Sequence, residues 1–459
     1  MTGGTPREAL EAMGATRLRL EIPDTNGVLR GKYLPPKKLL DGKGAGFSDV
    51  LYCLTSADEV FENPQLTSYD TGFPDVLAVP DWSTLRPVPW EQGVAAVLCD
   101  MTTKDGRPVG VDPRAALRGA CERLSATGYE GRAGVEYEFF VFHHDEEGRR
   151  ALREGRPRDL RPVGSEQQAY SLIRWPDIAD FAHELFRDMA SYGVPIESMT
   201  TELGYGMLEV AIAPLGALEA ADAAARFKLG CKELARRQDM IACFIAKLDM
   251  EQSGSSGHVH VSLLRGGEPC MREGVGQLSD VGRRCVGGLA ATAVETSVFM
   301  SPFPNSYRRF QPGLWTPVNV TWGHDNRNAC LRAITVSDGA ARIEHRRPGA
   351  DLNPYLAVAA CADGCRHGVE AQLEPPPEAP GRAFDDERAQ PLPAELAEAT
   401  DALLGSSLVR EWYGDALVDH YALSRHAEHE EWRKIAAGSH ETSSEQVPDW
   451  ELRRYFEII

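Results

Sequence analysis

Val135-Glu-Tyr-Glu-Phe-Phe-Val-Phe142 is rich in β-branched and aromatic residues, and this composition predicts a β-strand. Glu136 and Glu138 stand two residues apart, so their side chains point to the same face of that strand. Two neighbouring carboxylates on an apolar strand are costly unless a cation lies between them. A divalent metal ion would compensate them. The alternative, which this segment alone leaves open, is a sheet edge with two exposed glutamates.

Four further candidate ligands lie in segments of the same alternating kind. Glu202 and Glu209 flank a glycine-containing turn that can fold two strands back together. His258 follows a glycine-rich segment and alternates with His260, and Glu344 lies in the alternating stretch 342–347. Five glutamates and one imidazole form an oxygen-dominated ligand set, which suits Mg²⁺ or Mn²⁺ better than structural zinc.

Arginines are concentrated in residues 308–347. They are Arg308, Arg309, Arg327, Arg332, Arg342, Arg346 and Arg347. Guanidinium groups match phosphate and carboxylate oxygens bidentately, and metal carboxylates beside clustered arginines are typical of phosphoryl transfer. The sequence has no GxxxxGK[ST] motif, so the pattern does not predict a P-loop.

The composition restricts the class of protein further. The 459 residues include 49 Lys and Arg against 68 Asp and Glu, a net charge of −19, which argues against a nucleic-acid partner. Hydrophobic residues make up 42% of the chain, enough for a large core. No segment has the roughly 20 apolar residues of a membrane span, and no signal peptide is recognisable. Ten scattered cysteines indicate free thiols in a reducing compartment, so we expect a cytoplasmic protein.

The pattern of elements changes near residue 110. Before it, short strands such as 18–22 and 28–33 alternate with turns. Asp112 and Pro113 then form a helix start, and strands and amphipathic helices mix beyond them. We expect a helix from Pro176 to Gly193 with Phe186 on its apolar face, an exposed proline-rich connector over 371–395, and a closing helix over 411–431. The order predicts an α+β protein with domains 1–110 and 111–459.

Six motifs in the same order resemble the type I glutamine synthetase family and its amine-ligating relatives. They are residues 134–140, 202–209, 254–263, 305–313, 326–332 and 342–355. The resemblance implies an N-terminal β-grasp domain and a catalytic domain built on a curved antiparallel sheet with outer helices. It also implies homo-oligomers, expected as a dodecamer of two hexameric rings, with each active site between neighbouring subunits.

The resemblance also implies a role for each matching residue. Glu138, Glu202 and Glu209 correspond to ligands of one metal ion, and Glu136, His258 and Glu344 to ligands of a second. Gly254, Arg309 and Arg346 correspond to holders of the substrate glutamate. Arg327 corresponds to the arginine that stabilises the transferring phosphoryl group, and Glu197, Ser262, Arg332 and Arg342 to groups that bind ATP.

The departures from the family lie where the amine binds. The ammonia-using enzymes have a glutamate on a flap, and this chain has Trp315 in the segment Pro312-Gly-Leu-Trp-Thr316. Tryptophan carries no charge for ammonium but can stack on an organic group. The family's Asp-Gly-Ser-Ser loop is absent, and Asp49 is its nearest substitute. Tyr170 matches the family's tyrosine at this pocket.

The resemblance and these departures predict an ATP-dependent ligase. It would join glutamate to an organic primary amine through a γ-glutamyl phosphate, with two Mg²⁺ or Mn²⁺ ions per site. One alternative is a true glutamine synthetase that uses ammonia. Others are a catalytically inactive structural or regulatory relative and an ATP-dependent phosphotransferase with a different acceptor.

Overall fold

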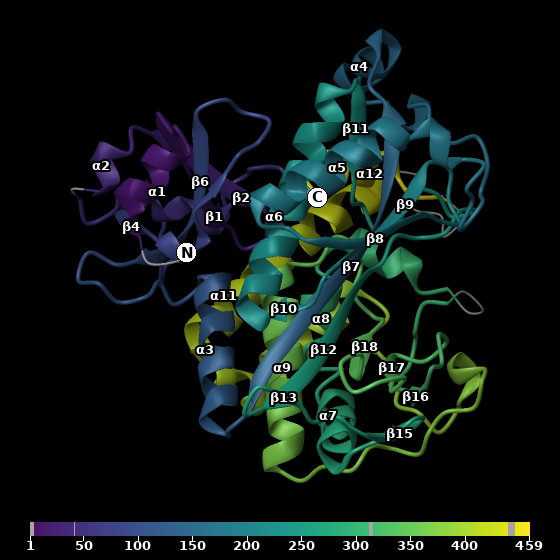
Figure 1. Ribbon diagram of the computed structural model, residues 1–459. Helices are drawn as coiled ribbons and strands as arrows, with labels where there is room; N and C mark the ends of the chain where they lie inside the picture. The colour runs from purple at the N-terminus through teal and green to yellow at the C-terminus, as the bar shows by residue number, and fades with distance from the viewer. Residues whose placement is uncertain (1–3, 41, 312–314, 439–445) are drawn as a thin grey trace.

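The computed structural model describes residues 4–40, 42–311, 315–438 and 446–459, and two sheets organise them (Figure 1). The first lies between residues 17 and 102 and the second between residues 130 and 345. They therefore lie on opposite sides of the predicted division near residue 110, which stays a prediction. Within the described ranges, no helix combines the length and the apolar character that crossing a membrane requires.

The N-terminal sheet has the strand order β2-β1-β6-β4-β3, with β5 beside β6. Its strands are β1 (Arg17–Pro23), β2 (Leu29–Leu34), β3 (Ala45–Ser48), β4 (Asp75–Pro80), β5 (Arg86–Pro87) and β6 (Val94–Thr102). β1 and β6 pair in parallel and the other neighbours pair antiparallel. The short helices α1 (Pro6–Ala12) and α2 (Lys37–Leu40) flank the sheet. This arrangement agrees with the predicted β-grasp domain.

The second sheet has the order β16-β17-β18-β12-β7-β9-β8, with β10 and β11 beside β7 and β13 beside β12. Its strands are β7 (Glu130–His143), β8 (Ile196–Thr201), β9 (Met207–Ile212), β10 (Leu215–Gly216), β11 (Met240–Cys243), β12 (Gly257–Arg265), β13 (Glu268–Pro269), β16 (Trp322–His324), β17 (Leu331–Ile334) and β18 (Arg342–His345). The predicted antiparallel sheet is confirmed with one exception, since β16 pairs with β17 in parallel at the edge. A small hairpin, β14 (Arg272–Gly274) and β15 (Gln277–Leu278), stands apart.

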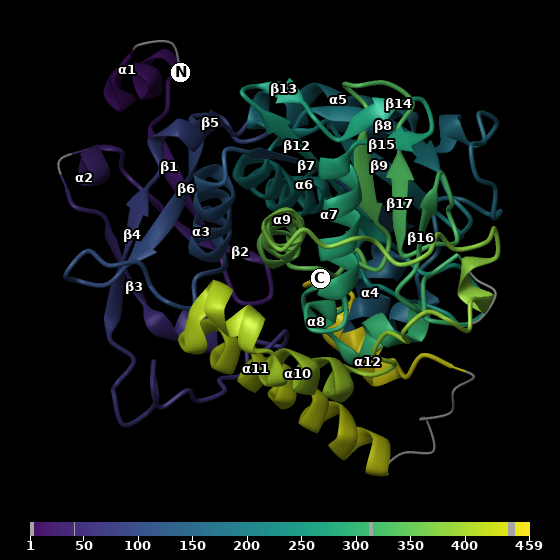
Figure 2. The ribbon, with the colours of Figure 1, turned by 90° about the horizontal axis from the view of Figure 1, so that it is seen from below.

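Helices cover the apolar face of the second sheet and the outside of the molecule (Figures 1 and 2). They are α3 (Pro113–Ala126), α4 (Glu146–Arg153), α5 (Ala179–Tyr192), α6 (Ala217–Arg237), α7 (Asp280–Ala291), α8 (Ser297–Met300), α9 (Pro354–Glu370), α10 (Leu396–Gly405), α11 (Ser407–Gly438) and α12 (Asp449–Tyr455). Figure 2 shows α10 and α11 along one side, beneath both parts of the chain. Glu428 of α11 accepts a hydrogen bond of 2.7 Å from the Ser56 hydroxyl, so this helix helps to join the two parts.

Two expectations about local structure need correction, and a third is confirmed. α5 begins at Ala179 rather than at Pro176, because residues 175–177 form a separate 3₁₀ turn. Phe186 is 37% exposed, since it lies one residue beyond the face that buries Leu185. The predicted closing helix lies within α11, which kinks at Gly414 (φ 77°, ψ 159°).

The connector over residues 371–395 is not simply exposed. The Trp322 indole donates a hydrogen bond of 2.7 Å to the Pro376 carbonyl, and the amide of Val320 donates one of 2.8 Å to the Gln390 carbonyl. The buried Arg347 guanidinium also donates to the Pro393 carbonyl. Prolines have free carbonyl acceptors, so a proline-rich segment can pack against the sheet through them.

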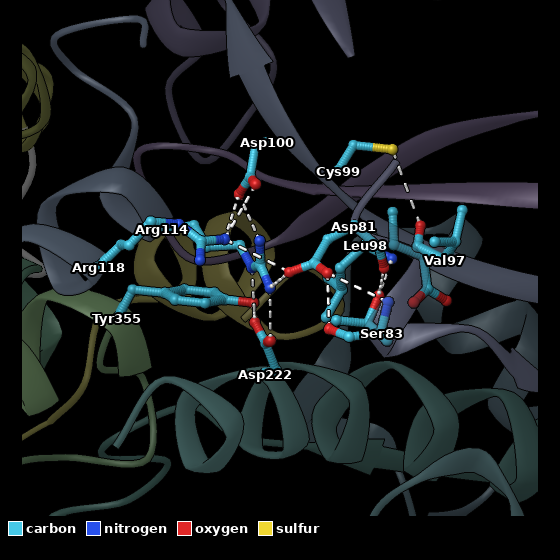
Figure 3. Close-up of polar contacts among 12 residues, drawn as sticks. Asp81, Ser83, Val97, Leu98, Cys99, Asp100, Arg114, Arg118, Asp222 and Tyr355 are labelled. Carbon is cyan, nitrogen blue, oxygen red and sulfur yellow. Dashed lines mark hydrogen bonds and ion pairs between the residues drawn. The ribbon is translucent and has the colours of Figure 1, made fainter. Parts of the chain in front are cut away.

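A buried charge network holds the N-terminal sheet against the helices (Figure 3). The Arg114 guanidinium of α3 donates to Asp222 of α6 at 2.8 and 2.9 Å and to Asp81 at 2.9 Å. Arg114 also pairs with Asp100 of β6. Tyr355 of α9 donates to Asp222 at 2.9 Å, so one arginine ties three helices to the first sheet.

Candidate active site

Strand β7 separates an apolar face from an acidic one. Tyr137 and Phe139 are fully buried and pack on Phe227 of α6, with ring centroids 5.9 and 5.8 Å away. Glu136 and Glu138 alternate with them and are half-buried on the opposite face. β7 pairs with β12 on one side and with β9 on the other, so it is an interior strand. The alternative of an exposed sheet edge is therefore wrong.

Glu136, His258 and Glu344 converge on one point. Each offers a ligand atom, and these atoms lie within 4.8 Å of one another. His258 Nδ1 is 3.0 Å from Glu136 Oε1 and 3.4 Å from Glu344 Oε1. The sheet register explains this, because His258 lies directly opposite Glu136 across the β7–β12 pair. Two carboxylates and an imidazole in this arrangement form a candidate site for a divalent cation.

The cations around this first cluster already compensate its carboxylates. Burial raises the pKa of Glu344, but the charges of His258 and Arg346 outweigh it and lower that pKa to about 2. The Arg332 guanidinium also donates to Glu344 Oε2 at 2.9 Å. Burial likewise opposes the ionisation of Glu136, and its contacts with His258 and His260 nevertheless hold its pKa well below the usual range.

The other three predicted metal ligands lie beside this cluster and lack such compensation. Glu138 and Glu209 are cross-strand partners, and Glu138 shares a cavity with Glu202. Burial, together with the charges of Glu136 and Glu138, raises the pKa of Glu209 to about 9. Burial and Glu138 also raise the pKa of Glu202. A cation among these carboxylates would remove their repulsion, so the residues fit a metal, and their assignment as its ligands stays a prediction.

Arg309 and Arg346 present hydrogen-bond donors beside the carboxylates. Arg309 is buried and donates to the Ser256 hydroxyl at 2.9 Å and to the Arg347 carbonyl at 3.1 Å. Among the described residues, the Nε atoms of Arg309 and Arg346 have no hydrogen-bond partner. A Cβ on Gly254 would lie 2.7 Å from Cγ of Arg309, so only glycine fits against this side chain. The geometry suits an anionic ligand such as a carboxylate.

A cavity of about 250 Å³ brings many of the predicted residues together. Its lining is Glu138, Glu202, Leu203, Met207, Ser253, Gly254, Ser256, Trp315, Thr316 and Arg346. Trp315 is 61% exposed at this cavity, and Leu203 is 37% exposed. Residues 312–314 of the predicted flap lie outside the described residues. A cavity of about 340 Å³ lies elsewhere, between residues 304–311 and α11, and it contains none of the carboxylates.

Tyr170 lies close to the same carboxylates, and Arg327 lies close to Tyr170. Burial and the charges of Glu209 and Glu202 raise the pKa of the Tyr170 phenol, whereas Arg327 lowers it. Both side chains are exposed, and Tyr170 has a positive φ of 54°. They are therefore near the site without lining its cavity.

A second cavity, of about 190 Å³, brings together Glu197, Ser262 and Arg342 on the other side of Glu136. Arg342 Nε donates to His260 Nδ1 at 3.1 Å, and His260 also lines this cavity. Arg332 does not line it, because it bonds to Glu344 and to Asp325. Three of the four predicted nucleotide-binding residues therefore share one hollow.

Asp49 lies with the N-terminal sheet, apart from the carboxylate cluster and both cavities. It is 3% exposed beside the N-terminal sheet and accepts a hydrogen bond of 2.5 Å from the Thr67 hydroxyl. Burial raises its pKa. A role for Asp49 stays a prediction that requires a neighbouring copy of the chain.

The structure adds three residues to which the sequence analysis assigned no role. The Ser256 amide donates to Glu138 at 2.7 Å, His260 joins Arg342 to Glu136, and Leu203 lines the cavity beside Trp315. Alternation with His258 was a signal for His260. Ser256 and Leu203 gave no signal, because their contacts depend on how loops fold over the sheet.

Comparisons with known proteins give one consistent family. The model of "Glutamine synthetase, catalytic domain" matches residues 110–455. The chain is 36% identical to glutamate–isopropylamine ligase of Pseudomonas sp, over 99% of this chain and 97% of that one. It is 35% identical to gamma-glutamylethanolamide synthetase GlnA4 of Streptomyces coelicolor, over 95% and 92% of the two chains. A solved structure, "GmaS/ADP complex-Conformation 1", has a TM-score of 0.81 and 25% identity over 98% of each chain.

Proposed function

The chain belongs to the glutamine synthetase family, and we propose that it is an ATP-dependent ligase that joins glutamate to an organic primary amine. The observation that carries this proposal is Trp315, an aromatic side chain at the cavity that also holds Glu138, Glu202 and Arg346. Relatives named glutamate–isopropylamine ligase and gamma-glutamylethanolamide synthetase support the same activity.

Glutamate binding would use the donors described above. The α-carboxylate would accept hydrogen bonds from Arg309 and Arg346, whose Nε atoms have no partner among the described residues. Gly254 lets the Arg309 side chain pack against the backbone at this cavity. This placement directs the γ-carboxylate of glutamate towards the acidic cluster.

ATP would bind along the cavity of Glu197, Ser262 and Arg342, with its γ-phosphate at the carboxylates. Two divalent cations, Mg²⁺ or Mn²⁺, held by the two carboxylate groups would neutralise the phosphate oxygens. Arg327 would stabilise the phosphoryl group in transit. Arg332 would bind the ATP phosphates and hold the metal ligand Glu344, to which it donates a hydrogen bond. The γ-carboxylate oxygen attacks phosphorus, ADP leaves, and an acyl phosphate forms.

The amine then attacks the acyl phosphate and displaces inorganic phosphate. Trp315 would cover the organic part of the amine, with Tyr170 at the mouth of the site. The protonated organic amine must lose a proton before its nitrogen can attack. Asp49 of a neighbouring subunit is our candidate for the base that removes this proton. This role requires the homo-oligomer that the family implies, which we propose to be a dodecamer of two hexameric rings.

Phosphate release from ATP and glutamate, measured amine by amine, tests the proposal. We expect at least one organic primary amine to raise phosphate release well above background, with the γ-glutamyl amide confirmed by mass. Trp315→Ala should raise the KM for that amine more than the KM for ATP or glutamate, and Val275→Ala in the β14–β15 turn is the exposed control. Full turnover with ammonium alone would instead establish a glutamine synthetase, and no turnover with any acceptor would favour the inactive relative.

A further inference from the structure

We propose that the acceptor is a monoamine with an uncharged substituent, and that Leu203 helps to exclude diamines and polyamines. This inference rests on the proposed function and narrows its substrate class. The observation behind it is the set of side chains around the acceptor end of the cavity of about 250 Å³.

The acceptor end of this cavity has apolar walls. Leu203 and Trp315 come from separate segments, and both line the cavity while keeping 37% and 61% of their surface exposed. Met207 contributes a thioether to the same lining and is itself buried. An alkyl or aryl substituent that contacts these side chains leaves water, at about 25 cal/mol per Å² of apolar surface.

The carboxylates in the described lining are already committed. Glu138 accepts the Ser256 amide at 2.7 Å, and both Glu138 and Glu202 belong to the predicted metal site. Glu166 borders a neighbouring hollow instead and pairs with Arg174 at 3.9 Å. Asp49 is our candidate for removing the proton from the reacting nitrogen, so it cannot also hold a second ammonium.

Among the described residues of this chain, no uncommitted carboxylate in the lining would therefore pair with a second ammonium on the substrate. Burying an unpaired ammonium is strongly unfavourable, whereas a methyl group in the same place gains from burial. Ser253 and Thr316 offer hydroxyls in the lining, which can bond an uncharged polar group but cannot neutralise an ammonium. Hydroxyl-bearing monoamines are thus compatible with the site.

The test compares two acceptors of the same shape with the wild-type protein. 1-Aminopentane carries a methyl group where 1,4-diaminobutane carries its second ammonium. We expect kcat/KM for phosphate release to be at least about tenfold higher for 1-aminopentane. Equal or higher values for the diamine would overturn the inference while leaving the ligase proposal intact. Failure of every amine would overturn the ligase proposal itself.

Three variants test the contribution of Leu203. Leu203→Asp should raise the ratio of diamine to monoamine kcat/KM by at least about tenfold, because it supplies the missing charge. Leu203→Asn, of similar size and neutral, should lower monoamine use without raising diamine use. Val275→Asp adds the same charge on an exposed turn and should leave the ratio unchanged.

Equal ratios for Leu203→Asp and Leu203→Asn would overturn the role assigned to Leu203. If Leu203→Asp loses all turnover, Thr316→Asp places a carboxylate on the same cavity from the other side and carries the test instead. An unchanged ratio in that variant would overturn the claim that charge sets the selection.

Discussion

Two groups of charged residues in this chain differ in how their carboxylates are paired. In the network of Figure 3, Asp81, Asp100 and Asp222 each contact an arginine at 2.9 Å or less. At the candidate active site, no ion pair joins Glu138, Glu202 or Glu209 to a cation among the described residues, and the pKa of Glu209 rises to about 9.

For these two groups, the difference indicates a structural role for the network of Figure 3 and a cation-binding role for Glu138, Glu202 and Glu209. It is no general rule, because Glu344 pairs with Arg332 and is also a predicted metal ligand. A buried carboxylate that is paired within the chain lowers its own energy and fixes the fold. A group of carboxylates left without internal cations raises the energy of the empty protein, and either bound protons or an external cation can relieve it. Burial alone would not distinguish the two groups, because both contain half-buried carboxylates, such as Asp81 and Asp100 in one and Glu138 and Glu209 in the other.

The largest expected effect is a loss of turnover when Glu138 is changed. We call Glu138, Glu202 and Glu209 the unpaired group. Glu138→Gln keeps the shape of the side chain and removes a charged metal ligand, so we expect turnover to fall by about 10³-fold or more. Glu130→Gln changes an exposed residue at the start of the same strand and should leave turnover unchanged. Calorimetry with Mg²⁺ should show weakened binding in Glu138→Gln alone. Near-native turnover in that variant would remove Glu138 from the ligand set.

The next largest effect is a loss of kcat when Arg327 is changed. Arg327 is exposed, whereas Arg114 of the paired network is buried. If Arg327 stabilises the phosphoryl group in transit, Arg327→Lys should lose about 10²-fold in kcat, because a point charge cannot replace the planar guanidinium. The KM for ATP should change little. Arg283→Lys on α7 is the surface control. A change confined to the KM for ATP would assign Arg327 to nucleotide binding instead.

A smaller effect, on stability, is expected in the network of Figure 3. We call its carboxylates, Asp81, Asp100 and Asp222, the paired group. Asp222→Asn keeps hydrogen-bonding atoms near Arg114 and Tyr355 but removes the charge, so we expect a loss of about 2 kcal/mol in the free energy of unfolding. Turnover per folded molecule should stay near the wild-type value. Urea denaturation measures the first quantity. A variant with unchanged stability and lost turnover would reverse the contrast between the two groups.

The sequence predicted most of what depends on local spacing. The alternation at Glu136 and Glu138 placed both on one face of β7, and Asp112 with Pro113 located the start of α3. The contacts of Leu203 and Ser256 could not be predicted, because the segments that carry them meet only in the folded sheet. The paired network was also missed, since Arg114 and Asp222 are 108 residues apart.

The connector and Phe186 show two further reasons for incomplete prediction. Proline content indicated exposure over residues 371–395, but it does not report the carbonyl oxygens through which that segment packs. Helical periodicity placed Phe186 on the apolar face, although such a face has edges that a pattern of single residues does not define.

The last prediction concerns Asp112, which lies beside the paired group and has backbone amides as its hydrogen-bond partners. It caps α3 by accepting the Arg114 amide at 2.9 Å. It is fully buried, and burial raises its pKa from 3.8 to about 7. Between these two values the native state holds a proton that the unfolded state has released. The stability contributed by this group is therefore complete below pH 3.8 and is lost as the pH rises through 7.

Asp112→Asn should remove that pH dependence, because asparagine caps helices well and does not titrate. We expect the variant to match the wild type in free energy of unfolding near pH 4 and to exceed it near pH 8. Chemical denaturation at both pH values, with Asp105→Asn as the exposed control, measures it. If the wild type were instead the more stable protein at pH 8, Asp112 would be ionised and stabilised by Arg114, and it would belong to the paired group after all.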